Sequence, residues 1–559
     1  MVNVANELIA AVSTGSFFEK IIELDQGEFG EQLPNELISM HNRAQVNLIS
    51  EFRKLPSFDG NNYSLLYLFG KCLPEIVAPT HVVMDCVLEL SAEEGAEMIF
   101  SDFTGYCAKE QHRSVEVLKT ALAAPKCYRF ISCALVAGAK YIEFDFIGKA
   151  RELLDNSESE VRVQTVIALE RVISSDNALC TGKLCKKIEE FILIEKEPAV
   201  LACCFELIFT LKFSDKDSKK RLVLFSKILC SGDEVVLHRA ALFLSLNVNR
   251  LSCELVEIFL TTLKGVPLER KGTIGFIDRA LSELVKRKRE EHALVFIESY
   301  LVTSGASIRL FSAFCRAVTR NSPFVLNKLV TRWLLSENVM LCDATSDILG
   351  FDYEHEAILE VYQDELGAKD SVIFLAKRAV GYLFLLPVSG ASFLVSLLQY
   401  ASAENRKIVE SLLLDFFVKN YPGKVLNYLE KEPSVEMVLD VVEQGKRYFD
   451  ELASVPEIKE LHPSMGERQA ALRKQRVEDA EIRKAADEQS IFRHFCSSVH
   501  VLYGNGVVFQ RVISESESER ATVPFAPINT SVELPQLVSM YPEYIESVLL
   551  NLRTEKRDK

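Results

Sequence analysis

Apolar residues recur along most of the first 450 residues with a period of about 3.6, in segments of roughly 10–18 residues. Short polar breaks separate the segments, for example at 58–62, 214–220 and 403–407. Because few stretches alternate with a period of two, the pattern predicts an all-helical chain. The segments are too many and too short for one long bundle, which makes internal repetition the next feature to look for.

The clearest repeated unit is LLDNSESEVRVQTVIALERVI at 153–173, in which a polar turn precedes a helix that begins at Val161 and Arg162. Two later segments repeat this layout, with Val200 and Val236 in the place of Val161, at intervals of 39 and 36 residues. We call Val161, Val200 and Val236 the anchor valines. Looser copies begin near Ile274, Ile308, Val339 and Val372. Since one helix pair cannot bury its apolar face alone, the repetition predicts stacked pairs that share a core.

The unit resembles a HEAT repeat, in which a turn of acidic character precedes Val-Arg and a helix of small residues. Asn156 stands where that family usually has aspartate, and Thr165 and Val166 replace the usual alanines. The resemblance implies a HEAT/armadillo-like α-solenoid of stacked helix pairs, and a scaffold or adaptor rather than an enzyme. It also implies that Arg162 joins the acidic turn of a neighbouring repeat. We therefore expect Arg162 to be partly buried and paired.

The sequence changes character twice after residue 450. The stretch 457–495 is dense in charge and rich in Ala, which favours a helix that is polar nearly all round. Two β-prone runs around Asn505-Gly506 predict a hairpin, 528–534 is a candidate third strand, and 541–556 predicts an amphipathic helix. We expect four segments: atypical helical repeats (1–150), HEAT-like repeats (151–450), a charged helical segment (451–495) and a small mixed α+β cap of hairpin and helix (496–559).

The stretch 379–403 carries no charge over 25 residues, a length that suits a transmembrane helix. Pro387, Ser389 and Gly390 interrupt its middle, so a turn between two buried helices is the favoured interpretation and a membrane segment is the alternative. The N-terminus has no basic region and carries Glu7, which does not fit a secretory signal. The 14 cysteines include no CxxC pair and sit mostly in apolar runs. These features together predict reduced, core-packed thiols in a cytoplasmic protein.

Composition and motifs limit the function classes. Apolar residues make up 48% and charged residues 26%, which excludes wholesale disorder. The net charge of −15 marks an acidic protein with no global basic field for nucleic acid. Walker-type GxxxxGK[ST], GxSxG and HExxH patterns are missing from the sequence. We assign no catalytic, cofactor-binding or metal-binding residue, and we expect no membrane partner.

Two clusters came closest to a reactive site. In the run 354–356, Glu-His-Glu, neighbouring residues of a helix would point in different directions, so a solvated face is favoured over a metal site. Cys496 with His494 and His500 lacks a third group to orient a nucleophile. Neither cluster supports an enzyme.

Basic residues give the candidate partner contacts. Lys286, Arg287, Lys288 and Arg289 follow a predicted helix end, where cations favour the helix dipole; an anion or nucleic-acid contact is the alternative. Four arginines of the charged segment form a candidate docking surface: Arg468, Arg473, Arg476 and Arg483. The sequence therefore favours a scaffold that binds a protein along a solenoid surface. The alternative is a nucleic-acid-binding accessory subunit or a HEAT-like DNA glycosylase, conceivably in a bacterial defence or repair complex, which a continuous basic stripe would favour.

Reversal of these four arginines to glutamate tests the docking surface. The melting temperature should change little, because exposed charges contribute little to stability. Partner binding should weaken, and the loss should be larger at low salt, since screening already removes the contribution at high salt. A pull-down in which the quadruple variant keeps its full partner set would reduce the segment to a bridge between helical elements.

Overall fold

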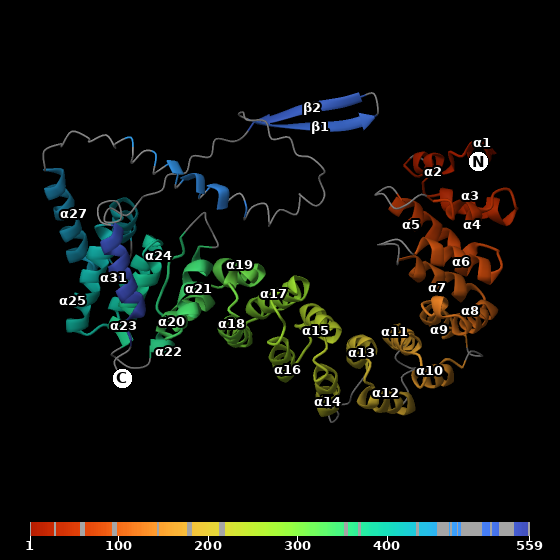
Figure 1. Cartoon of the computed structure of the whole chain (residues 1–559), viewed down its shortest axis with the longest axis horizontal. Helices are drawn as coiled ribbons and strands as arrows, with labels where there is room; N and C mark the ends of the chain where they lie inside the picture. Colours follow the sequence, from red (N-terminus) through yellow and green to blue (C-terminus); the bar gives the residue numbers. More distant parts are fainter. Residues whose placement is uncertain are drawn as a thin grey trace. The chain divides into compact units, whose positions relative to one another are not determined.

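The computed structural model describes residues 2–26, 30–55, 62–91, 98–141, 145–175, 182–211, 218–350, 356–366, 371–431, 435–454, scattered positions between 465 and 484, 506–514, 517–524 and 542–556. These residues are predominantly helical, as the periodicity predicted (Figure 1). Contacts group the chain into two compact units, Met1–His355 and Glu356–Lys559. The expected division into four segments stays a prediction.

The described helices of the first unit follow one another with short connections. They are α1 (Val2–Thr14), α2 (Phe17–Asp25), α3 (Leu33–Asn42), α4 (Leu48–Phe52), α5 (Asn62–Cys72), α6 (Thr80–Leu90), α7 (Ile99–Lys109), α8 (Gln111–Ala123), α9 (Phe130–Gly138), α10 (Phe146–Leu154), α11 (Ser159–Ser175), α12 (Gly182–Ile194), α13 (Pro198–Thr210), α14 (Ser218–Leu229), α15 (Glu234–Asn247), α16 (Cys253–Leu263), α17 (Lys271–Lys286), α18 (Glu290–Ser304), α19 (Ser312–Asn321), α20 (Pro323–Leu335) and α21 (Val339–Leu349).

Local sequence signals set several of these boundaries. The side chains of Asp233 and Ser252 accept backbone N–H groups and so cap the starts of α15 and α16. Pro198 and Pro323 open α13 and α20, where a proline loses no helical hydrogen bond. Gly305 ends α18 with a φ of 69°, a left-handed conformation that glycine adopts without strain.

From α7 to α19 in sequence, the helices of the first unit are arranged in two layers. In one layer the odd-numbered helices pack in order, α7 on α9, then α11, α13, α15, α17 and α19. In the other, α10 packs on α12, then α14, α16 and α18. Connected helices such as α10 and α11, or α17 and α18, join the two layers. This order is consistent with an α-solenoid-like fold, because each pair covers the apolar face of the pair before it.

The anchor valines occupy equivalent positions. Each is the third residue of its helix, α11, α13 or α15, and each is buried. Among the looser anchors, Ile274, Ile308 and Val372 are buried as well. Val339 is 52% exposed, and Leu341, the third residue of α21, is buried in its place. The buried residue of the copy near Val339 thus lies two residues after Val339.

Arg162 forms the pairing that the HEAT-like pattern predicted. Its Nε atom lies 2.7 Å from Oε2 of Glu195, and its Nη2 atom donates to Oε1 at 3.1 Å. The Nη1 atom donates to the carbonyl oxygens of Asn156 and Ser157 at 2.9 and 3.0 Å. The Arg162 side chain is 15% exposed. It thus holds the turn before its own helix and the turn of the next pair at the same time.

Glu195 lies between α12 and α13, and its carboxylate accepts hydrogen bonds from Arg162 and from the backbone. Besides Arg162, the backbone N–H groups of Lys196 and Glu197 donate to its Oε1 atom, each at 2.9 Å. Burial alone would raise the pKa of Glu195, but these hydrogen bonds and the charge of Arg162 outweigh it and lower the pKa below its ordinary value. The carboxylate is therefore held in its charged form by the fold.

Further polar ties join neighbouring pairs at about one repeat of separation. The Asp278 carboxylate accepts the N–H groups of Ala313 and Phe314, 35 and 36 residues later, at 2.8 Å each. It therefore satisfies two of the unpaired donors at the start of α19. The Tyr300 hydroxyl donates to the Val266 carbonyl at 2.8 Å, 34 residues earlier. These ties fix the register between pairs, which apolar contacts alone leave loose.

An aromatic cluster lies at the centre of the repeats that the sequence marked most clearly. Phe205, Phe225, Phe243 and Phe259 come from the four consecutive helices α13 to α16, and their ring centroids lie 5.4–6.0 Å apart. Each ring is fully buried. Such pairs add stability beyond their buried area, so both layers meet at these rings.

The second unit contains the following described elements: α22 (Gln363–Leu366), α23 (Ser371–Leu383), α24 (Pro387–Leu398), α25 (Ala403–Leu412), two π-helices (Leu413–Val418 and Pro422–Leu426), α26 (Asn427–Lys431), α27 (Leu439–Ala453), strands β1 (Gly506–Ser514) and β2 (Glu517–Pro524), and α31 (Pro542–Thr554). The charge-free stretch 379–403 contains the end of α23 and all of α24, two buried helices joined by a short break, as favoured. The two helices are separated at 384–386. The PVSG sequence, expected to form the connection, is instead the first helical turn of α24, because Pro387 fits a helix start. Among the described helices, none combines the length and apolar character needed to span a membrane.

The predicted hairpin turn at Asn505-Gly506 is wrong. Strands β1 and β2 pair antiparallel with Gly506 opposite Pro524, so Gly506 lies at the open end of the ladder and the strands are joined after Ser514. The polar second strand, Glu517–Pro524, can pair because ladder hydrogen bonds come from the backbone and do not need apolar side chains. The run before Asn505 and the candidate strand at 528–534 lie outside the described residues. The expected α+β cap is not supported, since α31 packs on α23.

The Arg162 tie yields a prediction about stability. Arg162→Ala should lower the free energy of unfolding by about 1–3 kcal/mol, because the buried Glu195 carboxylate loses the two guanidinium donors and two carbonyl oxygens lose a third. Urea denaturation of the two proteins measures the difference. Lys186→Ala is the control, since that side chain is 76% exposed and its nearest carboxylate is 3.8 Å away. An equal effect of both variants would contradict the structural role of Arg162.

The lowered pKa of Glu195 yields a further prediction, about pH. A carboxyl group with a lowered folded pKa stabilises the fold above its unfolded pKa, and that contribution is lost as the pH falls through the folded value. The stability gap between the wild type and Glu195→Gln should therefore be full near neutral pH and shrink below about pH 4.3, the ordinary pKa of glutamate. Denaturation at a series of pH values measures it. A gap that does not change with pH would contradict the assignment.

Candidate functional site

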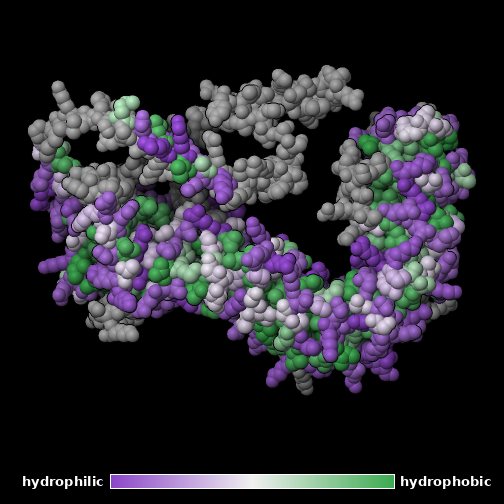
Figure 2. All heavy atoms as spheres, in the orientation of Figure 1, coloured by the Kyte–Doolittle hydropathy of each residue, from purple (hydrophilic) through white to green (hydrophobic). Residues whose placement is uncertain are grey.

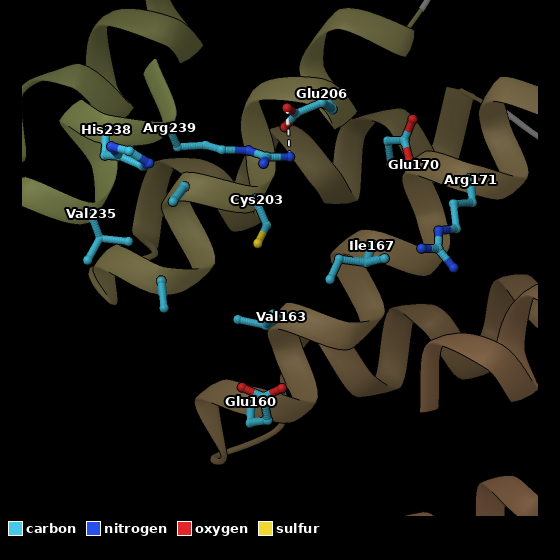
Figure 3. Close-up of a pocket in the computed structure, with 12 residues that line it drawn as sticks. Glu160, Val163, Ile167, Glu170, Arg171, Cys203, Glu206, Val235, His238 and Arg239 are labelled. Atoms are coloured by element: carbon cyan, nitrogen blue, oxygen red, sulfur yellow. Dashed lines mark ion pairs between the residues drawn. The ribbon is translucent and has the colours of Figure 1, made fainter. Parts of the chain in front are cut away.

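A hollow of about 540 Å³ lies across α11, α13 and α15 in the first unit (Figure 3). Five apolar residues line it: Val163, Ile167, Ala199, Ala202 and Val235. Five charged residues line it as well: Glu160, Glu170, Arg171, Glu206 and Arg239. Cys203 and His238 complete the lining. We call this site the α11–α15 hollow.

The repeat itself places these side chains on one surface. The residues immediately before the anchor valines line the hollow: Glu160, Ala199 and Val235. The residues two positions after the anchors line it too: Val163, Ala202 and His238. Positions spaced by three or four lie on one helix face, so these residues border the same hollow. Glu160, Ala199, Val235 and His238 are exposed, whereas Val163 and Ala202 are buried. Three consecutive repeats thereby build one continuous site.

One ion pair crosses the hollow between α13 and α15. The Nη2 atom of Arg239 lies 2.8 Å from Oε1 of Glu206, and Figure 3 shows the guanidinium extended along the surface towards that carboxylate. Burial raises the pKa of Glu206 above its ordinary value, although the charge of Arg239 opposes this. The pair therefore fixes both side chains and leaves Glu160, Glu170 and Arg171 as the hollow's other charges.

His238 is held by the next helix of the layer. Its Nδ1 atom lies 2.8 Å from the Thr273 hydroxyl of α17, and its ring meets Phe276 edge-on with centroids 5.4 Å apart. These contacts orient the imidazole and tie α15 to α17. The hollow is therefore a preformed surface whose polar side chains are positioned by their own neighbours.

The chemistry of the hollow suits binding. Burial raises the pKa of the Cys203 thiol to about 11, so the sulfur stays protonated near neutral pH and is a poor nucleophile. Within the part of the chain that the structure describes, no group of three or more His, Cys, Asp or Glu side chains could hold a metal ion. Apolar side chains beside charges of both signs can instead cover a complementary polypeptide surface.

The basic run at the end of α17 does not form one surface. Arg289 turns towards the preceding pair, where its Nη1 atom donates to the carbonyl oxygens of Val248 and Leu251 at 3.0 Å each. Lys286 pairs with Glu283 at 2.8 Å, while Arg287 caps the helix end. Lys288 has a φ of 58° and is exposed. The run thus ends a helix, as the dipole interpretation predicted, and none of its residues lines the hollow.

The other candidates are distributed as follows. Arg473 and Arg476 lie in helical backbone and are exposed, whereas Arg468 and Arg483 lie outside the described residues. Of the acid–histidine run, only Glu356 is described; it accepts the N–H of Val388 at 2.7 Å and pairs with Lys424 at 3.2 Å. Glu356 therefore caps α24. Cys496, His494 and His500 also lie outside the described residues.

Sequence motifs did not point to the hollow, because its residues belong to no chemical motif. The signal that could have found it is positional. Once the anchor valines are aligned, the outward positions of three repeats can be read off at fixed offsets. Comparisons add no family assignment: no protein-family model matches the chain, and no curated protein matches it significantly.

Proposed function

We propose that the chain is a non-catalytic cytoplasmic scaffold, a HEAT-like α-solenoid that binds a protein partner across the α11–α15 hollow. The observation that carries the proposal is the lining of the hollow, in which apolar side chains from three consecutive repeats lie beside carboxylates and guanidinium groups. Over the helices of the first unit seen in Figure 2, hydrophilic residues and small apolar patches are interspersed. Protein–protein interfaces share this mixture of an apolar centre and a polar rim.

The charges of the hollow favour a protein over a nucleic acid. Glu160, Glu170 and Glu206 line it, against Arg171 and Arg239, and Arg239 is already paired with Glu206. A nucleic-acid backbone requires several unpaired cations for its phosphates, and carboxylates at the same surface repel it. The nucleic-acid alternative therefore lacks a supporting observation at this site.

The same charges describe the partner. Ile167, Ala199 and Val235 keep exposed apolar surface and suit the apolar side of an amphipathic segment, such as a helix. Glu160 and Glu170 suit lysine or arginine side chains at the edge of that segment. The proposed partner is therefore a protein that presents an amphipathic segment with basic flanks.

A matched pair of valine substitutions tests the proposal. Val235 lies in the hollow and is 55% exposed, whereas Val223 on α14 lies outside it and is 56% exposed. Val235→Asp should weaken partner binding by about tenfold or more, because a carboxylate would enter the apolar part of the interface unpaired. Val223→Asp should bind normally. Both variants should fold, since both side chains are half exposed.

Quantitative affinity purification identifies the partner, and titration of the purified pair gives the two dissociation constants. Melting temperatures of both variants control for folding. If Val235→Asp and Val223→Asp bind the partner equally well, the hollow is not the binding surface.

A further inference from the structure

The last described helix of the chain docks on a helix far back in the sequence. Helix α31 packs against α23 in the second unit, and bonds between them join residues 172–178 positions apart. Ile545 and Leu549 are buried, whereas Tyr544 and Leu550 are 64% and 58% exposed. Helix α31 therefore packs on α23 through one apolar face, on which Ile545 and Leu549 are four residues apart.

Three polar bonds fasten the last turn of α31. Arg553 Nε donates to the carbonyl oxygen of Gly381 at 2.6 Å. Lys377 Nζ lies 2.6 Å from Oε1 of Glu555, and Arg378 Nη2 donates to the carbonyl oxygen of Glu555 at 3.1 Å. The C-terminal end of a helix carries unsatisfied carbonyl groups and partial negative charge, so the two cations of α23 are complementary to it.

Arg378 is only 3% exposed, so its side chain is buried in this contact. Its guanidinium carbon lies 5.0 Å from the ring centroid of Phe374 and 5.9 Å from that of Tyr382. Arg553 approaches the Tyr382 ring from the other helix at 5.5 Å. Aromatic faces stabilise such cations away from water, so α23 holds the receiving cation in place.

The fit between the helices is also steric. A Cβ atom at Gly381 would lie 2.9 Å from Cγ and 3.1 Å from the backbone nitrogen of Arg553. Any larger residue at 381 must therefore displace α31. Since the clash reaches backbone as well as side chain, a local rotamer change does not relieve it.

We propose that this surface of α23 is a helix-binding site and that α31 is its internal, exchangeable ligand. The site recognises a helix with two apolar residues four apart, an arginine four residues later and an acidic residue at its end. Ile545, Leu549, Arg553 and Glu555 supply that pattern, and the α31 helix of a second copy supplies it in trans. A helix with one face exposed, as Tyr544 and Leu550 show for α31, opens locally more readily than the core of a packed layer.

A synthetic peptide of residues 542–556 tests the proposal on the full-length chain. The double variant Ile545→Ser, Leu549→Ser weakens the packing of the chain's own α31 on α23 and changes no residue of α23. This variant should bind the labelled peptide saturably, at least tenfold tighter than the wild type, whose site is occupied by its own α31. Adding Gly381→Val to the double variant should abolish binding.

A charge swap separates recognition from a general effect on folding. Lys377→Glu in the double variant should weaken binding of the native peptide and restore it for a peptide with Glu555→Lys. If the double variant keeps its circular dichroism spectrum but binds no peptide, α31 is a fixed part of the fold and the proposal is overturned.

If the double variant does not fold, amide hydrogen exchange of the wild type tests independently whether α31 opens locally. The amides of α31 should exchange at least tenfold faster than those of α23. Equal protection of the two helices would overturn the proposal as well.

Discussion

The fold of the first unit depends on one constraint: a helix pair with a single apolar face is stable only when the next pair covers it. The anchor valines satisfy this constraint at the same helical position in α11, α13 and α15. Burial alone leaves neighbouring pairs free to slide, because hydrophobic contact is not directional. Directional ties at one repeat of separation, such as Arg162 with Glu195, remove that freedom. Register and stability therefore come from different interactions.

The same constraint explains where a binding surface can form. Each repeat uses its anchor for packing, and the residue just before each anchor is exposed: Glu160, Ala199 and Val235. Two residues after the anchor, His238 is exposed, whereas Val163 and Ala202 remain buried in the core. Three successive repeats bring these positions together with Arg171, Glu206 and Arg239 in the α11–α15 hollow. A repeat architecture thus buries its anchors and gathers the residues beside them on a shared surface.

The second unit solves its packing differently. Helix α31 covers α23 although the two helices are far apart in sequence, and the contact relies on cations that meet a helix end as much as on apolar burial. Gly381 has no side chain where the two backbones approach. Glycines at 390 and 445 play the same part elsewhere in the unit, where a Cβ atom would lie 2.2 Å from the Phe417 ring and 2.6 Å from Val418. Close helix contacts here depend on small residues rather than on a repeated anchor.

The sequence by itself determined the helical class, the repeat spacing and the buried anchors of α11, α13 and α15, because each of these follows from periodicity. The pairing of Arg162 was implied by the resemblance of its unit to a HEAT repeat. The sequence pattern placed the Val339 anchor two residues early, and it assigned the hairpin to the wrong turn, because an Asn-Gly signal is local whereas strand pairing is decided by backbone hydrogen bonds along the whole ladder. Only the tertiary structure joined Glu160, Glu206 and Arg239 into one hollow, and only it brought Arg553 to Gly381. Such residues lie in different repeats, or 172 positions apart in the case of Arg553 and Gly381, and they share no local sequence pattern. Their proximity results from the packing of helices, which local sequence patterns do not specify.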